Sequence, residues 1–205
     1  KGDHQWSWEN SESSPNGQLL LDGDCWPLPL PGRHNAANLC AAVLACRALG
    51  LDDSVLRKGL AGFSASDHRG SILAWKDCLI LDDSYNANPA SLQAAIISLT
   101  ELPGDRRTIA MVGAMAELGP DSVKIHNNSG KAMAETELNI LIAVGEKSFP
   151  LVDGFAASRD AESHQLPGFQ EAADWLKQNS KPGDRILIKG SRSSAMENII
   201  RKLGL

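Results

Sequence analysis

The second half of the chain alternates short apolar runs with longer stretches of helix-forming residues. The runs CLIL, TIAMV, NILIAV and RILI each have the length of one buried strand. Three helical stretches, PASLQAAIISL, DSVKIHNNSGKAMAE and SSAMENIIRKL, follow such runs, and FQEAADWLKQNS precedes the last run. Uninterrupted apolar strands that alternate with helices predict a parallel sheet covered on both faces. We therefore expect a Rossmann-like α/β domain in this half.

The first half follows a different pattern. Tryptophans alternate with polar residues near the start, which predicts small strands, and the proline-rich run CWPLPLPG is confined to a sheet edge or an extended approach. Residues 35–49 are rich in Ala and Leu and predict a helix that ends at Gly50. Asp52 or Asp53 can cap a second helix that runs to Leu60.

The composition changes between residues 64 and 77, where the small and polar stretch SASDHRG follows Phe63. This change predicts a domain boundary. We assign residues 1–75 to an incomplete first domain and residues 76–205 to the α/β domain, which then has an ordinary domain size.

Composition narrows the classes of partner. The chain has 205 residues, of which 42% are hydrophobic and 22% are charged, as in ordinary globular proteins. A formal charge of −5 provides no basic surface for nucleic acid or for an anionic membrane. Small molecules or other proteins are the expected partners.

The four cysteines indicate a reducing environment. They show no C-x-x-C spacing, and three of them lie in apolar runs as small hydrophobic residues. No run approaches the length of a membrane span, and no signal-like segment opens the chain, so we expect a cytoplasmic protein. The chain starts at Lys1 without an initiator methionine, which suggests a piece of a longer protein.

Two common nucleotide-binding motifs are missing from the sequence. There is no G-x-x-x-x-G-K-[ST] loop, and the superficially similar GEKS carries Glu146 where a glycine should precede the lysine. The Glu146 carboxylate would repel phosphate. A G-x-G-x-x-G fingerprint is also absent, so a nicotinamide dinucleotide is not expected.

The stretch DDSYNANP is unusually polar for a turn between a buried strand and a helix. Pro89 and a capping Asn88 or Ser91 explain the start of the helix, but Asp82 and Asp83 remain unexplained. A carboxylate at the carboxyl end of a strand can bind a ribose hydroxyl, a metal-bound water or a substrate ammonium. We interpret this stretch as part of a ligand site.

A second strand end, KGSRSSAMEN, has the residues of an anion site. Lys189 and Arg192 supply positive charge, and the serines precede the exposed N–H groups of a helix. A capping box formed by Ser194 and Glu197 is an alternative that can coexist with anion binding. His126, in IHNNSGK, is predicted to lie on a helix surface.

The helix start GRHNAAN places Asn35 and Asn38 on one face of the first turn. Primary amides both donate and accept, which suits the edge of a nucleobase. Simple helix capping explains the same pattern equally well.

Together, GRHNAAN, Arg69, DDSYNANP, VGAMAELG followed by His126, and KGSR-x-x-x-ME resemble the Mur ligase family in order from about residue 32 to the end. YNANP is the most specific element, and it is similar to the branch that adds D-alanyl-D-alanine. One departure is Ala114, where the family usually has an acidic residue. The resemblance implies the last part of a central ATP-binding domain in residues 1–75, followed by a complete C-terminal Rossmann-like domain.

The resemblance also implies an activity. ATP, with Mg²⁺, would phosphorylate the carboxylate of a UDP-MurNAc-tripeptide, and the amine of D-Ala-D-Ala would attack the acyl phosphate. Water destroys acyl phosphates, so the site should form only when domains close around the substrates. The implied ATP-side residues are His34, Asn35, Asn38, Arg69 and Asp83, or Asp82 if the register is shifted by one. The implied residues on the substrate side are Tyr85, Asn86, Asn88, Lys189, Ser191 and Arg192.

The phosphate loop and the acidic Mg²⁺ ligands of such an enzyme are missing from this sequence, and we assign no metal ligand to it. We therefore expect the 205 residues alone to be inactive, and the whole enzyme to be a monomer without a membrane span or a nucleic-acid partner. Two alternatives remain: another Mur-type or folylpolyglutamate-type ligase, and a non-catalytic α/β binding module.

Overall fold

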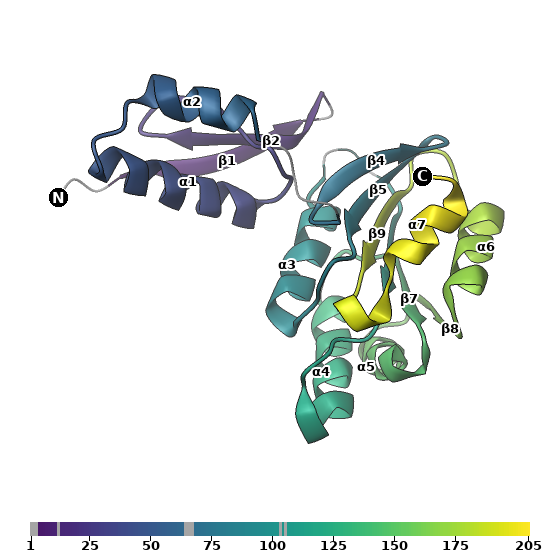
Figure 1. Ribbon diagram of the computed structural model, residues 1–205. Helices are drawn as coiled ribbons and strands as arrows, with labels where there is room; N and C mark the ends of the chain where they lie inside the picture. The colour runs from purple at the N-terminus through teal and green to yellow at the C-terminus, as the bar shows by residue number, and fades with distance from the viewer. Residues whose placement is uncertain (1–3, 12, 64–67, 103, 105) are drawn as a thin grey trace. The chain divides into compact units, whose positions relative to one another are not determined.

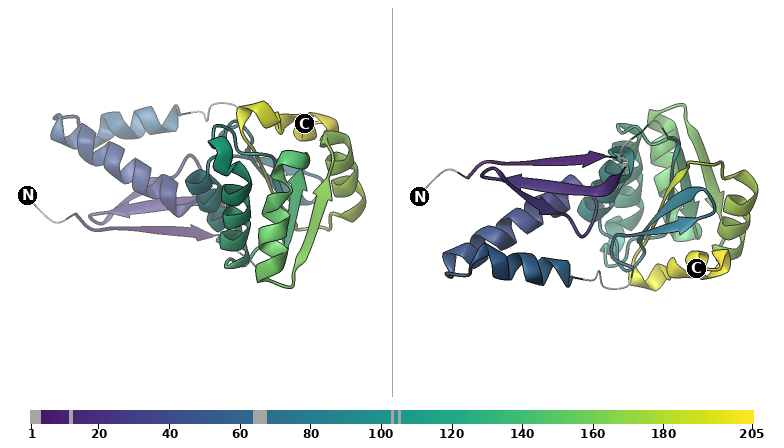
Figure 2. Two further views of the ribbon diagram at one scale, coloured as in Figure 1. Left: turned by 90° about the horizontal axis from the view of Figure 1, so that it is seen from below. Right: turned by 90° about the horizontal axis from the view of Figure 1, so that it is seen from above.

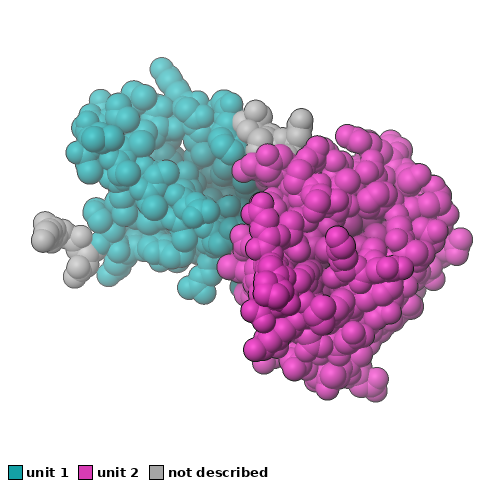
Figure 3. Space-filling view, turned by 60° about the horizontal axis from the view of Figure 1, so that its bottom comes forward, with its two compact units in different colours: residues 1–66, 101–104 teal, residues 67–100, 105–205 magenta. Residues whose placement is uncertain are grey.

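The computed structural model describes residues 4–11, 13–63, 68–102, 104 and 106–205. The chain divides into two compact units (Figure 3). Unit 1 comprises residues 1–66 and 101–104, and unit 2 comprises residues 67–100 and 105–205.

Unit 1 is a small antiparallel sheet with two helices on one of its faces (Figures 1 and 2). Its elements are β1 (Trp6–Ser11), β2 (Ser14–Leu21), β3 (Asp24–Pro27), α1 (Arg33–Ala48) and α2 (Asp53–Ala61). Leu19, Leu21 and Trp26 of the sheet pack against Ala36 and Val43 of α1. The predicted small strands and both predicted helices are therefore confirmed.

An arginine joins the two helices of unit 1. Arg47 Nη2 lies 2.6 Å from Asp53 Oδ2, and Arg47 Nε donates to Asp53 Oδ1 at 2.9 Å. The same guanidinium reaches Asp24 at 3.2 Å. Its contact holds the pKa of Asp53 below the ordinary value. Asp53 therefore binds Arg47, and the side chain of Asp52, the residue before α2, makes no capping hydrogen bond.

Unit 2 contains a six-stranded sheet in the order β4-β5-β9-β6-β7-β8. Every pairing is parallel except that of β4 with β5. The strands are β4 (Ser71–Trp75), β5 (Cys78–Asp83), β6 (Thr108–Val112), β7 (Ile140–Val144), β8 (Glu162–Leu166) and β9 (Arg185–Lys189). The helices are α3 (Pro89–Thr100), α4 (Ser122–Ala134), α5 (Pro150–Ser158), α6 (Phe169–Asn179) and α7 (Glu197–Leu203). This confirms the predicted α/β fold.

Helices cover both faces of this sheet (Figures 1 and 2). Helices α6 and α7 pack on one face, where Leu176 and Ile199 join Ile186 and Ile188 of β9 in one hydrophobic cluster. Leu187, between those two isoleucines, points to the opposite face, where α3, α4 and α5 lie. All residues of β6, β7 and β9 are buried, because a central parallel strand is covered on both sides.

The sequence did not predict two edge strands. β4 returns antiparallel to β5 through a two-residue turn at Lys76 and Asp77, in which Lys76 has a φ of 51°. This pairing places β4 in unit 2, so the chain divides before the boundary that we predicted at residues 75 and 76. β8 has the polar sequence ESHQL, which lacks the apolar signal of the inner strands. No helix in the described part of the chain is both long and apolar enough to span a bilayer.

Helices α4 and α5 approach each other closely at two glycines. A Cβ atom added at Gly130 would lie 2.0 Å from the carbonyl oxygen of Leu151, and one added at Gly154 would lie 2.0 Å from that of Asn127. Real side chains do not tolerate such distances. The backbones of the two helices are therefore in direct contact, and neither position has room for a methyl group.

We expect Gly130→Ala to lower the free energy of unfolding by about 1 to 3 kcal/mol, because the added methyl must push two helix backbones apart. Chemical denaturation followed by circular dichroism measures the change. Gly59→Ala in α2 is the matched control, since nothing lies within 4 Å of a Cβ at Gly59. The control should be neutral or stabilise by up to about 1 kcal/mol. Equal effects at the two positions would contradict the close contact.

Candidate functional site

The polar residues of unit 2 gather at the carboxyl ends of β5, β9 and β6, three adjacent strands. The chain crosses from β5 through α3 to β6, and only later returns through α6 to insert β9 between them. The direction of winding therefore changes beside β9. In open α/β sheets the loops at such a point form the ligand crevice. The predicted site residues of unit 2 are the last residues of β5 and β9, residues of the loops that follow them, and Arg69 before β4.

Lys189 at the end of β9 is buried and fully engaged. Its Nζ donates to Asp83 Oδ2 at the end of β5 and to the Asn86 carbonyl oxygen at 2.8 Å. Asp83 and Lys189 stand opposite each other in the strand register, so their side chains share one face of the sheet. Only 2% of the Lys189 side chain is exposed, against 26% for Asp83. Lys189 therefore fixes the β5–α3 loop and does not offer a free cation.

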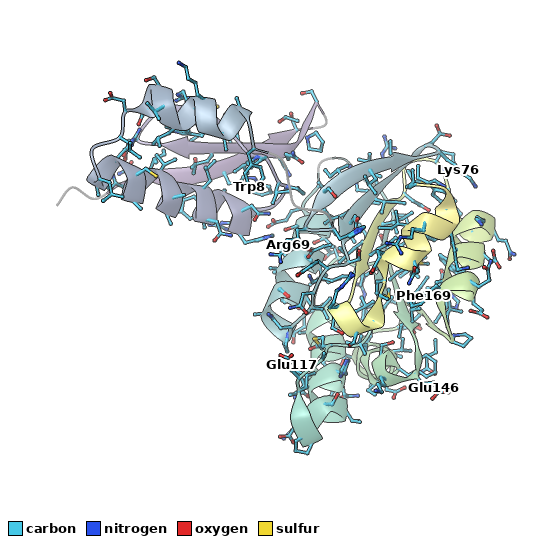
Figure 4. The ribbon with its side chains drawn as sticks, in the orientation of Figure 1. Trp8, Arg69, Lys76, Glu117, Glu146 and Phe169 are labelled. Carbon is cyan, nitrogen blue, oxygen red and sulfur yellow. The ribbon has the colours of Figure 1, made fainter. Side chains whose placement is uncertain are left out.

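Two arginine side chains lie near the ring of Tyr85. The guanidinium carbon of Arg69 lies 4.0 Å from the centre of the Tyr85 ring, and that of Arg192 lies at 5.9 Å. Tyr85 is 39% exposed, so this cationic and aromatic group is open to solvent. Figure 4 labels Arg69 within unit 2. The predicted ATP-side Arg69 and the predicted substrate-side Tyr85 and Arg192 are thus brought together.

Arg192 has an acidic partner as well. Its Nη1 donates to Glu197 Oε1 at 2.8 Å, and the Glu197 carboxylate is nearly fully buried. Among the described residues, Glu197 Oε2 has no hydrogen-bond partner. Glu197, which the sequence suggested for a capping box, therefore forms an ion pair with Arg192 instead.

The rest of the predicted capping box is wrong. Helix α7 begins at Glu197 without a side-chain cap, and Ser194 Oγ donates instead to the Ala114 carbonyl oxygen at 2.7 Å. The Ser191 N–H donates to the same oxygen at 3.0 Å. Added Cβ atoms at Gly113 and Gly190 would lie 2.7 and 2.6 Å from atoms of Met196. The loops after β6 and β9 are thus packed directly together.

The side-chain oxygens of the two asparagines of DDSYNANP accept hydrogen bonds from backbone N–H groups. Asn88 Oδ1 accepts the Ser91 N–H at 2.8 Å, and Ser91 Oγ accepts the Asn88 N–H at 3.1 Å, which caps α3 reciprocally. Asn86 Oδ1 accepts the Ala87 N–H at 2.9 Å. Both asparagines are exposed.

Asp82 belongs to a group that the sequence did not indicate. Its Oδ2 lies 2.7 Å from His68 Nδ1, and its Oδ1 accepts Ser84 Oγ at 2.6 Å. Asp82 is 3% exposed, and the Tyr85 N–H donates to the His68 carbonyl oxygen at 3.0 Å. His68 stands directly before Arg69, and that adjacency to a predicted site residue was the one available signal.

His126 is buried, so the prediction that it lies on a helix surface was wrong. Its Nε2 accepts the Met115 N–H at 2.9 Å, and its Nδ1 donates to the Ser122 carbonyl oxygen at 2.7 Å. Both ring nitrogens are used. His126 ties the loop after β6 to the first turn of α4.

The remaining predicted residues, His34, Asn35 and Asn38, belong to unit 1 and lie in the first two turns of α1. Asn35 Nδ2 donates to the Pro31 carbonyl oxygen at 2.8 Å, so this amide braces the approach to the helix. His34 and Asn38 are exposed. In the GEKS stretch, Ser148 Oγ donates to the Gly145 carbonyl oxygen at 2.7 Å. Within the described ranges, no group of three or more His, Cys, Asp or Glu residues could hold a metal ion.

A mostly parallel sheet with charged loops at the carboxyl ends of its central strands defines a ligand-binding α/β domain. The sequence profile of the family described as "Mur ligase, glutamate ligase domain" matches residues 68–192, which contain His68, Arg69, the β5–α3 loop, Lys189 and Arg192. The chain belongs to the Mur ligase family.

Individual relatives narrow the comparison. The chain is 37% identical over 182 residues to the UDP-N-acetylmuramoyl-tripeptide–D-alanyl-D-alanine ligase of Escherichia coli, a match that covers 86% of this chain and 38% of the relative. It is 34% identical to the ligase of the same name from Synechocystis, covering 90% and 40%. A crystal structure of MurF from Acinetobacter baumannii superimposes with a TM-score of 0.80 at 27% identity, covering 96% and 43%. The chain therefore spans about 40% of the length of these curated relatives.

Replacing Lys189 by Met should lower the free energy of unfolding by about 3 kcal/mol, because Asp83 and the Asn86 carbonyl lose the donor they share. The double variant Lys189→Met/Asp83→Asn should recover part of that loss, since it leaves no unpaired charge. Lys202→Met is the control, because Lys202 is exposed and contacts only Gln170 among its described hydrogen bonds. Equal losses for Lys189→Met and Lys202→Met in denaturant titrations would contradict the buried clamp.

Proposed function

We propose that this chain is the C-terminal part of an ATP-dependent amide ligase that joins D-Ala-D-Ala to a UDP-MurNAc-tripeptide in peptidoglycan precursor synthesis. Relatives with that name match most of the chain at up to 37% identity. The stretch YNANP, on the loop after β5, agrees with the same branch of the family. The observation that carries the proposal is the exposed group of Arg69, Tyr85 and Arg192 beside the Lys189–Asp83 pair.

The chemistry requires such a group. Transfer of the ATP γ-phosphate to a carboxylate gives an acyl phosphate, which the dipeptide amine attacks to form the amide. Positioning and neutralisation of negative charge supply most of the catalysis in phosphoryl transfer. Among the described residues, Arg69 forms no ion pair, and its guanidinium contacts the Tyr85 ring. A planar guanidinium held against an aromatic ring is well suited to bind phosphate or carboxylate oxygens in pairs.

Each predicted residue takes one side of the reaction in this proposal. On the nucleotide side, the proposal assigns the amides and imidazole of α1 to the base, Arg69 to the phosphates and Asp83 to the ribose. These residues are His34, Asn35, Asn38, Arg69 and Asp83. On the substrate side, the exposed Tyr85, Asn86, Asn88 and Arg192 bind the dipeptide and the precursor. The buried Lys189 and Ser191 hold their loops in place.

The proposal assigns Mg²⁺ to the phosphates of ATP and gives it no ligand in the described part of this chain. Unit 1, rather than the whole of residues 1–75, would complete a central ATP-binding domain that the rest of the longer protein supplies. The free thiols of Cys40 and Cys78 support a reducing, cytoplasmic setting. The isolated 205 residues should not catalyse ligation.

Phosphate release measured on the full-length protein tests the proposed activity. We expect release that requires ATP, the tripeptide precursor and D-Ala-D-Ala together, with a new amide product confirmed by mass spectrometry. The isolated chain should release phosphate only at background. Turnover by the isolated chain would contradict the expected inactivity of the 205 residues alone. Release by the full-length protein that does not depend on D-Ala-D-Ala would contradict the proposed activity. The gene upstream of Lys1 provides a second test: we expect it to encode a TGTNGKT-like phosphate loop in the same reading frame.

Arg69→Ala should lower kcat/KM for ATP about 10- to 100-fold, as expected for loss of one charge-assisted contact worth about 1.5 to 3 kcal/mol. Steady-state kinetics with saturating dipeptide and precursor measure the effect. Arg201→Ala is the control, because Arg201 is an exposed arginine whose described side-chain hydrogen bond goes to Asn198 on the same helix. Arg201→Ala should keep wild-type kinetics. An unchanged kcat/KM in Arg69→Ala would remove Arg69 from the site.

A further inference from the structure

His68 and Asp82 form an acid–imidazole pair that the assignments above leave without a role in the reaction. The Asp82 carboxylate is 3% exposed and has three donors: His68 Nδ1 at 2.7 Å, Ser84 Oγ at 2.6 Å and the Ser84 N–H at 3.2 Å. A buried carboxylate with these donors is an acceptor, so His68 carries its proton on Nδ1. The lone pair of the neutral ring is then on Nε2.

The backbone also holds His68 in place. Its φ is 65°, in the left-handed region that residues other than glycine seldom adopt. The Tyr85 N–H donates to the His68 carbonyl oxygen at 3.0 Å, and the Gly70 N–H donates to the Asp82 carbonyl oxygen at 2.7 Å. Uncommon backbone conformations persist where the surrounding structure fixes them, and they concentrate at functional sites. The ring is therefore held from both its side chain and its main chain.

The free side of the ring is available to a ligand. No described residue hydrogen-bonds His68 Nε2, and 28% of the side chain is exposed, whereas its partner Asp82 is covered. His68 is the chain neighbour of Arg69 and is hydrogen-bonded to Tyr85, the two residues whose contact defines the exposed cationic group. A buried carboxylate bound to one nitrogen of an imidazole whose other nitrogen is open to a ligand is the arrangement of a general base.

We propose that His68 is the general base that deprotonates the incoming amine, and that Asp82 is its positioning residue; this inference rests on the proposed function. The dipeptide arrives as an ammonium ion, and Nε2 of His68 takes one proton. The amine lone pair then forms the C–N bond to the acyl phosphate, and the C–O bond to phosphate breaks. The second proton of the nitrogen leaves with the phosphate as HPO₄²⁻, and the imidazolium returns its proton to solvent.

A general base is needed for an ammonium nucleophile and is dispensable for one that is already unprotonated. Hydroxylamine is such a nucleophile at neutral pH, and it traps acyl phosphates as hydroxamates. The test therefore compares two products of one full-length enzyme: the amide formed with D-Ala-D-Ala, and the hydroxamate formed with hydroxylamine. The variant is His68→Asn, whose side-chain amide can still donate to Asp82 but has no basic nitrogen.

We expect His68→Asn to lower kcat for amide formation about 10²- to 10⁴-fold while hydroxamate formation stays within about threefold of wild type. Asp82→Asn should show the same split with a smaller loss. His164→Asn is the matched control, because His164 is also a half-exposed histidine paired with a carboxylate, Glu162, at 2.8 Å, but it lies on β8 at the far edge of the sheet. The control should leave both products unchanged.

Two results would overturn the assignment. Wild-type amide synthesis by His68→Asn would show that the ring takes no proton, and equal losses of amide and hydroxamate would show a structural role. The thermal unfolding temperature of His68→Asn distinguishes a structural role in the folded site from misfolding of the whole protein, because only misfolding lowers that temperature strongly. Failure of the proposed function looks different, because the wild-type protein itself would then give no amide that depends on D-Ala-D-Ala.

Discussion

A lysine ammonium placed among central strands must have partners, and that requirement organises the carboxyl edge of the sheet. Lys189 finds the Asp83 carboxylate on the neighbouring strand and the Asn86 carbonyl on the following loop. Leaving such a charge unpaired in the interior would cost several kcal/mol, so the loop has little freedom to move away. The conformation of this loop in turn sets where Tyr85 stands. The position of the exposed aromatic ring is therefore a consequence of a buried ion pair beneath it.

The same logic accounts for the charges around that ring. Asp82 is matched with His68, Asp83 with Lys189 and Glu197 with Arg192, so three acidic groups at this edge each have a basic partner. At this edge the guanidinium of Arg69 lies against the Tyr85 ring, and among the described residues it forms no ion pair. Acidic groups that are already neutralised repel an incoming anion less, and the surplus positive charge is concentrated at one exposed guanidinium. Pairing thus prepares the edge for a phosphate or carboxylate ligand.

The periodicity of the sequence was enough to predict the inner strands and the helices, because buried strands are uniformly apolar and the helices have distinct compositions. It was not enough for β8, whose polar sequence ESHQL is only partly covered, or for β4, whose apolar run SILAW lies in the segment that the sequence assigned to a domain boundary. At the site, strand ends could be recognised from DDSYNANP and KGSR, but partners could not. A lysine at a strand end gives no indication that it is buried, and the pairing of Asp82 with His68 joins residues separated by the whole of β4. The burial of His126 was missed because it depends on packing across to Met115.

The polar edge strand β8 has a further consequence. An open strand edge presents unpaired backbone groups to any other extended chain, and apolar edges of this kind recruit neighbours. Another strand that paired with β8 would have to displace the water around Glu162 and His164, whose side chains are paired with each other and exposed. The polar residues that prevented the prediction of this strand also oppose its pairing with a strand of another molecule. We therefore expect ESHQL to help keep the protein from forming cross-β aggregates at high concentration.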